Sequence, residues 1–245
     1  MGLDLEACPH LALGTLDSTN EEALRRLERG ELPVPCLLTA RKQTDGRGRH
    51  RGRKWVSEAG NLFATLVLEQ NAAPPPSCLS LLAACAVYRA ARHFVDPAVV
   101  LSLKWPNDVL LCDQKVAGIL LETGAKGTLL IGMGVNLVSA PAVSILHRAS
   151  TCLQAWSSAR AVTREAYLPV LLAAFSALFS LWKTQGIPAI IAEWLGNSQD
   201  VGRPLILRMG QEEIRGVFES LNAEGFLVLR LPDGQSKIVA SGEVQ

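Results

Sequence analysis

The stretch VVLSLKWPNDVLLCDQKVAGILLETGAKGTLLIGMGVNL, residues 99–137, decides the fold. Its apolar, β-rich runs predict strands over residues 99–105, 109–112, 115–123 and 128–137. Short segments rich in Pro, Asn, Asp and Gly supply the turns between these runs. Strands joined by such short turns form an antiparallel meander, and the strand–helix alternation of a doubly wound parallel sheet is missing from this stretch.

Outside the meander, strand and helix signals alternate. Ser18 and Glu21 have the spacing of a capping box and Gly30 follows, so we expect a helix between them. Apolar runs and turn signals predict further strands over 35–43 and 61–69, and helices over 77–94, 163–184 and 188–195. We therefore predict an α+β fold with a mixed or antiparallel sheet and flanking helices.

The last fifty or so residues have a different character. Short strands are expected over 204–209, 213–221, 226–231 and 236–240, with Gly-, Asn- and Pro-rich turns between them. A compact all-β module of this length has the size of an SH3-like barrel. We accordingly divide the chain into a domain of residues 1–196 and a β domain of residues 197–245.

Charge and composition exclude several classes of protein. The 245-residue chain has a formal net charge of +1, whereas a dedicated nucleic-acid-binding domain carries a basic face. Its six cysteines and four histidines are scattered, which argues against a zinc site or a disulfide framework and suits a reducing cytosol. The first ten residues lack the pattern of a signal peptide. Residues 166–182 are apolar but interrupted by Pro169 and two serines, so we predict a core helix, no membrane association and a cytoplasmic protein.

One loop carries an unusual concentration of arginine and glycine: Gly46-Arg47-Gly48-Arg49-His50-Arg51-Gly52-Arg53-Lys54-Trp55. Glycine lets a backbone approach a ligand closely, and arginine presents a planar fork of donors to carboxylate or phosphate oxygens. The closing tryptophan offers a flat face for a base or another ring. The loop therefore predicts an anionic ligand that carries an aromatic group, and a nucleotide fits that description.

Three further segments occur with this loop, namely Asp17-Ser18-Thr19-Asn20, Lys104-Trp105-Pro106-Asn107-Asp108, and Gly132-Met133-Gly134-Val135-Asn136 preceded by residues 115–122. In this order and at these separations the segments resemble those of the biotin–protein ligases. The resemblance runs from about residue 14 to the C-terminus. It implies a class II synthetase-like catalytic domain followed by a small SH3-like β barrel.

The resemblance also implies a reaction in two steps. Biotin and MgATP give biotinyl-5′-AMP and pyrophosphate, and a lysine of a biotin carboxyl carrier protein then attacks the acyl phosphate. The first step brings two anions together, so we expect Lys104 to be the central cation between the biotin carboxylate and the α-phosphate. Arg47 and Arg49 are expected to hold the acyl-adenylate, and the closed loop to exclude water.

The resemblance assigns the remaining ligand contacts residue by residue. Biotin contacts are expected from Ser18, Thr19, Asn20, Gln43, Gly46, Arg47, Gly48, Arg49, Lys104, Gly118, Gly132 and Gly134. ATP or adenylate contacts are expected from Arg49, Arg53, Trp55, Lys104, Asn107 and Asn136. No metal site made by protein groups alone is expected, because Mg²⁺ would accompany ATP.

The chain departs from the family pattern in three places. Its arginine loop is one residue longer, with His50 and Arg51 in the place of one residue. About sixteen residues precede Asp17, which is too few for the helix-turn-helix domain of some relatives, so we expect a monofunctional ligase that binds no operator. The chain stops at Gln245, where relatives often continue with an arginine that touches the nucleotide.

Alternatives remain at this point. A lipoate–protein ligase shares the fold and the two-step logic, although its usual Arg-Arg…Gly-Gly-Gly loop is missing. A nucleic-acid-binding module would use the arginine loop and the β domain, with steeply salt-dependent binding. A catalytically inactive biotin-binding or carrier-docking protein is the third alternative. The oligomeric state is also open, and a homodimer through a sheet edge is one solution.

Overall fold

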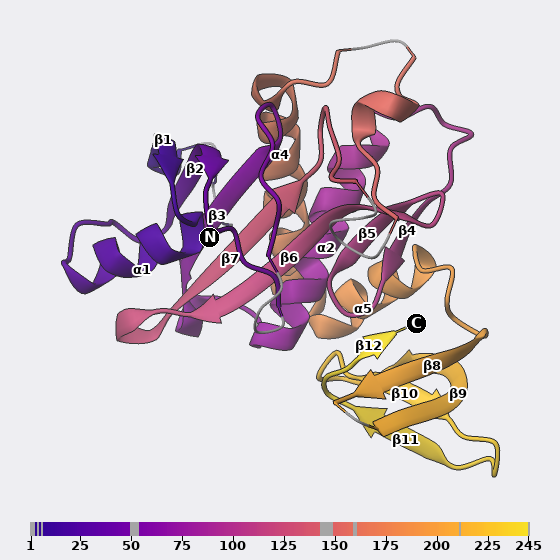
Figure 1. Ribbon diagram of the computed structural model, residues 1–245. Coiled ribbons are helices and arrows are strands. Elements are labelled where there is room, and N and C mark those ends of the chain that lie inside the picture. The colour runs from indigo at the N-terminus through magenta and orange to yellow at the C-terminus, as the bar shows by residue number, and fades with distance from the viewer. Residues whose placement is uncertain are drawn as a thin grey trace.

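A computed structural model describes residues 3, 5, 7–49, 54–142, 149–158, 161–210 and 212–244. Its larger sheet has seven strands in the order β1-β2-β3-β7-β6-β5-β4 (Figure 1). The strands are β1 His10–Leu16, β2 Cys36–Gln43, β3 Leu62–Glu69, β4 Leu101–Lys104, β5 Asp108–Leu111, β6 Gln114–Thr123 and β7 Thr128–Val135. Only β1 and β2 pair in parallel within this sheet; every other neighbouring pair is antiparallel.

The predicted meander is confirmed, because β4, β5, β6 and β7 follow one another and pair antiparallel in chain order. β1 is a strand that the sequence did not indicate. It lies at the sheet edge beside β2, and its residues alternate between partly and fully exposed, so it lacks the apolar run by which strands are recognised.

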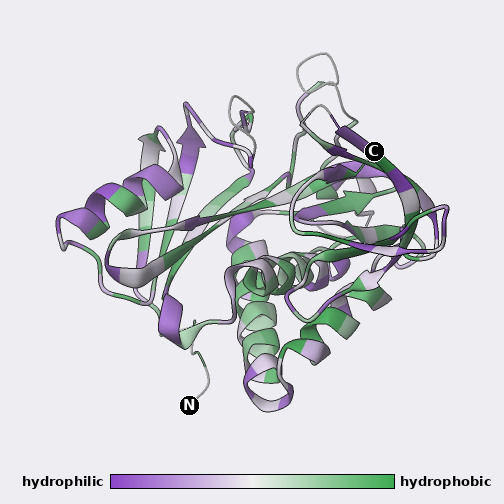
Figure 2. Ribbon diagram, turned by 90° about the horizontal axis from the view of Figure 1, so that it is seen from below, coloured by the Kyte–Doolittle hydropathy of each residue, from purple (hydrophilic) through white to green (hydrophobic). Residues whose placement is uncertain are grey.

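Helices cover both faces of the sheet. The helices are α1 Thr19–Glu28, α2 Pro76–Arg92, α4 Arg164–Gln185 and α5 Ile187–Gly196, with 3₁₀ turns at Gln70–Ala72, Ala125–Gly127 and Leu153–Trp156. In Figure 2 the long helices beneath the sheet are largely hydrophobic, whereas α1, at the left in Figures 1 and 2, is largely hydrophilic. The main core therefore lies between the sheet and the α2, α4 and α5 layer, and a smaller cluster lies under α1.

Side-chain alternation along β7 shows how these two faces differ. Ile131, Met133 and Val135 point into the main core. Because successive residues of a strand point to opposite faces, Gly132 and Gly134 open onto the α1 face instead. The α1 face therefore has a stretch of sheet without side chains, and a ligand or a ring can lie flat against it.

The expected α1 helix forms, but its predicted cap is wrong in detail. Ser18 occupies the N-cap position, yet among the described residues its side chain makes no capping hydrogen bond. Glu21, the other half of the expected capping box, instead pairs with Arg47. The helix ends at the predicted place, where Gly30 adopts a φ of +71° that glycine alone accommodates readily.

α4 has the length and apolarity of a membrane-spanning helix. Six of its large side chains, among them Tyr167, Leu171, Phe175 and Leu178, are nevertheless buried in the main core. The Tyr167 hydroxyl donates to the Val87 carbonyl of α2 at 3.1 Å. Its outward positions are taken mostly by small residues such as Ala173 and Ala177. The apolar composition is that of the core helix the sequence predicted.

The C-terminal part forms a second, five-stranded antiparallel sheet in the order β11-β10-β9-β8-β12. The strands are β8 Pro204–Met209, β9 Glu212–Leu221, β10 Leu227–Arg230, β11 Ser236–Val239 and β12 Glu243–Val244. Its apolar residues continue the main core, and the indole NH of Trp105 donates to the Gly225 carbonyl at 3.3 Å. The domain boundary that we placed at residue 197 stays a prediction.

Candidate active site

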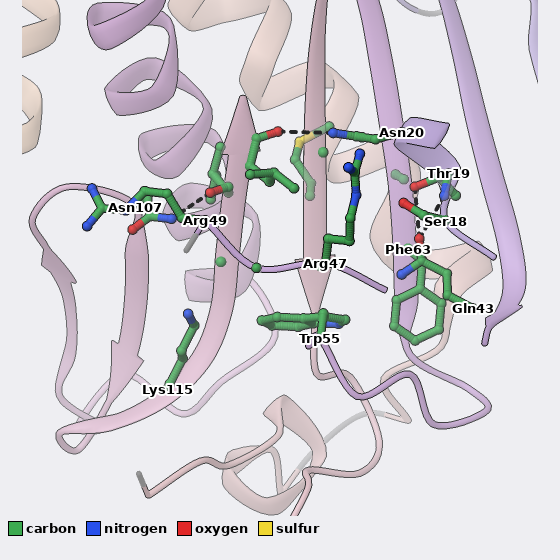
Figure 3. A pocket seen from close by; sticks show the side chains of 18 residues that line it. Ser18, Thr19, Asn20, Gln43, Arg47, Arg49, Trp55, Phe63, Asn107 and Lys115 are labelled. Atoms are coloured by element: carbon green, nitrogen blue, oxygen red, sulfur yellow. Dashed lines mark hydrogen bonds between the residues drawn. The ribbon is translucent and has the colours of Figure 1, made fainter. Parts of the chain in front are cut away.

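A small cavity opens on the α1 face of the larger sheet, above the glycines of β6 and β7 (Figure 3). Its volume is about 60 Å³. The lining residues are Ser18, Thr19, Asn20, Gln43, Arg47, Gly48, Arg49, Trp55, Phe63, Ala64, Asn107, Lys115, Gly118, Ile119, Leu120, Gly132, Met133 and Gly134. Ligand pockets usually measure about 300–1,000 Å³, so we expect side chains of this wall to move when a ligand binds.

One end of the cavity consists of hydroxyl and amide groups. The Gln43 Oε1 atom accepts from the Thr19 backbone NH at 2.8 Å and from the Thr19 hydroxyl at 3.1 Å, as Figure 3 shows. The Gln43 amide nitrogen donates to the Ser57 hydroxyl at 3.2 Å. These bonds fix the Gln43 amide, so this end offers preset donors and acceptors to a neutral polar ring.

Asp17 anchors the start of α1 beside this end. Its carboxylate accepts from the Ser18 backbone NH at 2.7 Å and pairs with both terminal nitrogens of Arg25, at 2.6 and 2.7 Å. The hydrogen bonds from Arg25 lower the pKa of Asp17 from 3.8 to about 2. Because the folded pKa is depressed, the stabilisation is complete above pH 3.8 and is lost as the pH falls towards 2.

We therefore expect Asp17→Asn to lower the free energy of unfolding near neutral pH, and this difference from the wild type to shrink between about pH 4 and pH 2. The effect should be small, because the pair is well exposed to water. Urea denaturation over a pH series would measure it. In an Arg25→Gln background the same substitution should show no such pH dependence; a persisting dependence would contradict the assignment to this pair.

Trp55 lies flat over the glycines of the cavity floor. A Cβ at Gly134 would lie 2.5 Å from the Trp55 ring, and a Cβ at Gly118 would lie 3.2 Å from it. The indole nitrogen is buried without a hydrogen-bond partner among the described residues. The glycines thus hold the tryptophan ring against the sheet, in a position that an incoming ring could share or take over.

Lys115 supplies a cation at the opposite end. Its ammonium lies 2.6 Å from the Asp108 carboxylate and 5.5 Å from the centre of the Trp55 ring. The backbone of Lys115 is bonded on both sides to the segment of residues 149–151, so the side chain projects from a fixed position. Asn107, also in the wall, donates to the Ile119 carbonyl at 2.6 Å.

The two described loop arginines have different environments. The Arg47 guanidinium lies between Glu21 and Glu122, at 2.6 and 2.9 Å. Arg49 donates to the Gly242 carbonyl, just before β12. The C-terminal sheet therefore reaches the site through its backbone, a contact that no side-chain pattern could have indicated.

Most of the expected ligand-binding residues gather at this cavity, with four exceptions. Lys104 ends β4, two strands away from the β6 strand that borders the cavity, and it does not line the wall. Gly46 lies just behind the wall, where its carbonyl accepts from the Trp55 NH at 2.8 Å. Asn136 is buried and donates to the Thr151 carbonyl at 3.1 Å. Arg53 lies outside the described residues.

Lys115 and Phe63 line the wall although the sequence analysis gave them no role. Lys115 stood in the quoted segment of residues 115–122, three positions before Gly118. That nearness to a predicted floor glycine was the available signal. Phe63 carried no signal, because one aromatic in an apolar strand looks like core.

Comparisons with known proteins agree with this arrangement. The Biotin/lipoate A/B protein ligase family matches residues 13–136, and the Biotin protein ligase C terminal domain matches residues 201–245. The chain is 41% identical over 237 residues to the biotin–[acetyl-CoA-carboxylase] ligase of Paracoccus denitrificans, covering 94% of this chain and 97% of that protein. It is 31% identical to the bifunctional ligase/repressor BirA of Escherichia coli, covering 95% of this chain and 72% of BirA.

Solved structures give the same result. The biotin protein ligase from Aquifex aeolicus in complex with biotin and ATP matches with a TM-score of 0.82 and 26% identity, covering 97% of each chain. The predicted fold, a mixed sheet with helices and a C-terminal β domain, is confirmed by this match. Fold and site together define a ligase of the biotin and lipoate type. Within that class, the chain belongs to the biotin protein ligases.

Proposed function

We propose that this chain activates biotin and transfers it to one lysine of a carboxyl carrier protein. A carboxylate oxygen of biotin attacks the α-phosphorus of ATP, the bond to the β-phosphate oxygen breaks, and pyrophosphate leaves. The acceptor amine then attacks the acyl carbon, AMP leaves, and the amine gives up a proton. The biotin–[acetyl-CoA-carboxylase] ligase activity rests on the family and on the 41% identical relative.

The observation that carries the proposal is the division of one cavity into two chemical ends. Hydroxyl and amide groups around Gln43 suit the uncharged ureido ring of biotin. Lys115 and Arg49 suit the carboxylate and the phosphates. The glycine floor under Trp55 joins the two ends, so a flat ligand lying along it would place its carboxylate near the cations.

We assign the central cation to Lys115 in place of Lys104. Negative charge develops where the carboxylate meets the α-phosphate, and a donor must lie at that place to stabilise it. Lys115 lines the cavity and Lys104 does not. Asp108 holds the Lys115 ammonium at 2.6 Å and thereby keeps it oriented before the substrates arrive.

Magnesium is proposed to enter with ATP. Among the described residues no group of three or more His, Cys, Asp or Glu side chains is placed to hold a metal ion. Asp108, beside the cavity, already pairs with Lys115. Mg²⁺ is commonly held by one or two carboxylates together with substrate phosphates, so the triphosphate would supply most of its ligands and the ion would neutralise phosphate charge.

The acceptor is proposed to be a biotin carboxyl carrier protein, in keeping with the name of the Paracoccus relative. We also propose that the protein is cytoplasmic, because its six cysteines are scattered along the sequence and suit a reducing compartment. A homodimer and the lack of operator binding stay predictions from the sequence.

Biotin-dependent exchange of pyrophosphate into ATP tests the first half-reaction. We expect exchange with biotin and none with lipoate, because the loop is of the biotin type. Adding a biotin carboxyl carrier domain should then release AMP and increase the carrier mass by one biotinyl group. Exchange with lipoate alone would move the chain to the sister activity, and exchange with neither acid would support a non-catalytic binding protein.

A further inference from the structure

Glu122 occupies a central position behind the cavity wall. It lies on β6, and its carboxylate accepts from Arg47 Nη2 at 2.9 Å and from Asn20 Nδ2 at 2.8 Å, both contacts being made through the same Oε2 atom. The side chain is only 26% exposed. A partly buried carboxylate that bonds two wall residues at once fixes the position of each relative to the sheet.

Arg47 is compensated from both sides. Glu21 of α1 lies 2.6 Å from its Nη1, opposite Glu122. One guanidinium therefore faces two carboxylates, and the cluster carries excess negative charge. An arginine in this environment attracts a phosphate poorly, because the incoming anion would meet the two carboxylates as well.

One hydrogen-bond donor of the Arg47 guanidinium is nevertheless unpaired among the described residues. Its Nε atom is buried and has no hydrogen-bond partner among the described residues. Buried donors are normally paired, so this NH is a candidate for a neutral acceptor on the ligand. With its outer nitrogens fixed by the carboxylates, Arg47 offers a single directed hydrogen bond at the cavity.

Asn20 is held just as closely. It is 2% exposed, its Oδ1 accepts from the Thr65 hydroxyl at 2.5 Å, and its Nδ2 donates to Glu122. The space beside it is full, because a Cβ at Gly132 would lie 2.7 Å from Asn20 Oδ1. Glu122 thus determines which way the Asn20 amide points and how the sheet wall is shaped at this place.

We propose that Glu122 is a positioning residue for biotin: it orients Arg47 and Asn20 as a fixed wall and, with Glu21, keeps Arg47 from acting as a phosphate ligand. The triphosphate is thereby directed to the end of the cavity where Lys115 lies. This inference rests on the proposed ligase function. It also changes the role expected for Arg47, from adenylate binding to recognition of the uncharged part of biotin.

The test is steady-state pyrophosphate exchange by Glu122→Gln with the concentrations of biotin and ATP varied separately. We expect the KM for biotin to rise about tenfold, since the substitution removes the charge of the carboxylate that accepts from both Arg47 and Asn20. The KM for ATP and kcat should change less than about threefold. An unchanged KM for biotin, or a change confined to ATP or kcat, would overturn the proposal.

Matched controls separate positioning from general destabilisation. Glu22 is next to Glu21 in the chain, but its carboxylate pairs with Arg25 and Arg26 outside the cavity. Glu22→Gln should therefore leave the KM values for biotin and for ATP unchanged. In an Arg47→Met background, Glu122→Gln should raise the KM for biotin by a smaller factor than in the wild type. Equal factors in the two backgrounds would contradict an action through Arg47.

Two further readouts keep the result interpretable. If Glu122→Gln folds poorly by circular dichroism, Glu122→Asp keeps the charge but draws the carboxylate back, and the same selective loss of biotin binding is expected. The wild-type protein is assayed first. A wild type without biotin-dependent exchange contradicts the ligase function itself, whereas an active wild type with an indifferent Glu122→Gln variant contradicts only the positioning role.

Discussion

Replacing Lys115 by methionine is expected to slow formation of biotinyl-5′-AMP by about a hundredfold to a thousandfold, the loss that follows removal of one preorganised charge-stabilising group. Methionine keeps much of the length of the side chain but removes the positive charge at the place where two anions must approach. Pyrophosphate exchange at saturating biotin and ATP measures the effect directly. Lys104→Met is the matched control and should retain exchange close to the wild-type rate.

The Lys115 substitution needs its own stability control. Asp108 is buried and lies 2.6 Å from the Lys115 ammonium, so a methionine at 115 weakens the compensation of that carboxylate and destabilises the fold. The double variant Lys115→Met/Asp108→Asn should recover thermal stability without recovering exchange. If Lys104→Met were inactive and Lys115→Met active, the central cation would be Lys104 after all.

The two lysines show what a sequence can and cannot determine about this site. Both stand in segments that resemble the family, and both flank turns of the meander. Lys115 lines the cavity and Lys104 does not, because β6 borders the glycine floor whereas β4 is the outer edge strand of the sheet. The meander itself was predictable because its turns are local and chemically marked, whereas the position of the cavity over particular strands depends on pairing across the whole sheet.

Long-range pairing also explains the other gaps in the prediction. β1 and β2 pair although α1 separates them in the chain, and β12 pairs with β8 although β9, β10 and β11 lie between them in the chain. Arg47 looked like a phosphate ligand in its loop, but its partners Glu21 and Glu122 come from α1 and β6. No local sequence pattern encodes contacts between such distant segments. Residue type and motif therefore predicted a cation at this position, but the two carboxylates beside it could be identified only from the structure.

Gly118, Gly132 and Gly134 were expected to contact biotin, and in the structure the Trp55 ring lies against Gly118 and Gly134. Trp55 rests on Gly134, where a Cβ would lie 2.5 Å from Cε2 and 2.9 Å from Nε1 of its ring. Because the Trp55 ring lies on the glycine floor, a ligand ring placed on that floor must move or share the place of this ring. The position of Trp55 on the floor is therefore expected to be coupled to catalysis.

Gly134→Ala should lower kcat/KM for adenylation by about a hundredfold, because the added methyl group displaces the Trp55 ring from the glycine floor. A displacement of about 1 Å in an active site can lower the rate by about a hundredfold. The measurement is pyrophosphate exchange at low biotin and ATP. Gly14→Ala is the matched control: it also lies in a strand of the sheet, has nothing within 4 Å of its Cβ, and should retain full activity.

The cause of that loss can be separated by removing the ring. If the methyl group acts by displacing Trp55, then Gly134→Ala in a Trp55→Ala background should lower activity by a much smaller factor than it does in the wild type, since the contact no longer exists. If the methyl group instead obstructs the ligand, the factor should be the same in both backgrounds. We expect the first result, because the added carbon would lie 2.5 Å from the Trp55 ring.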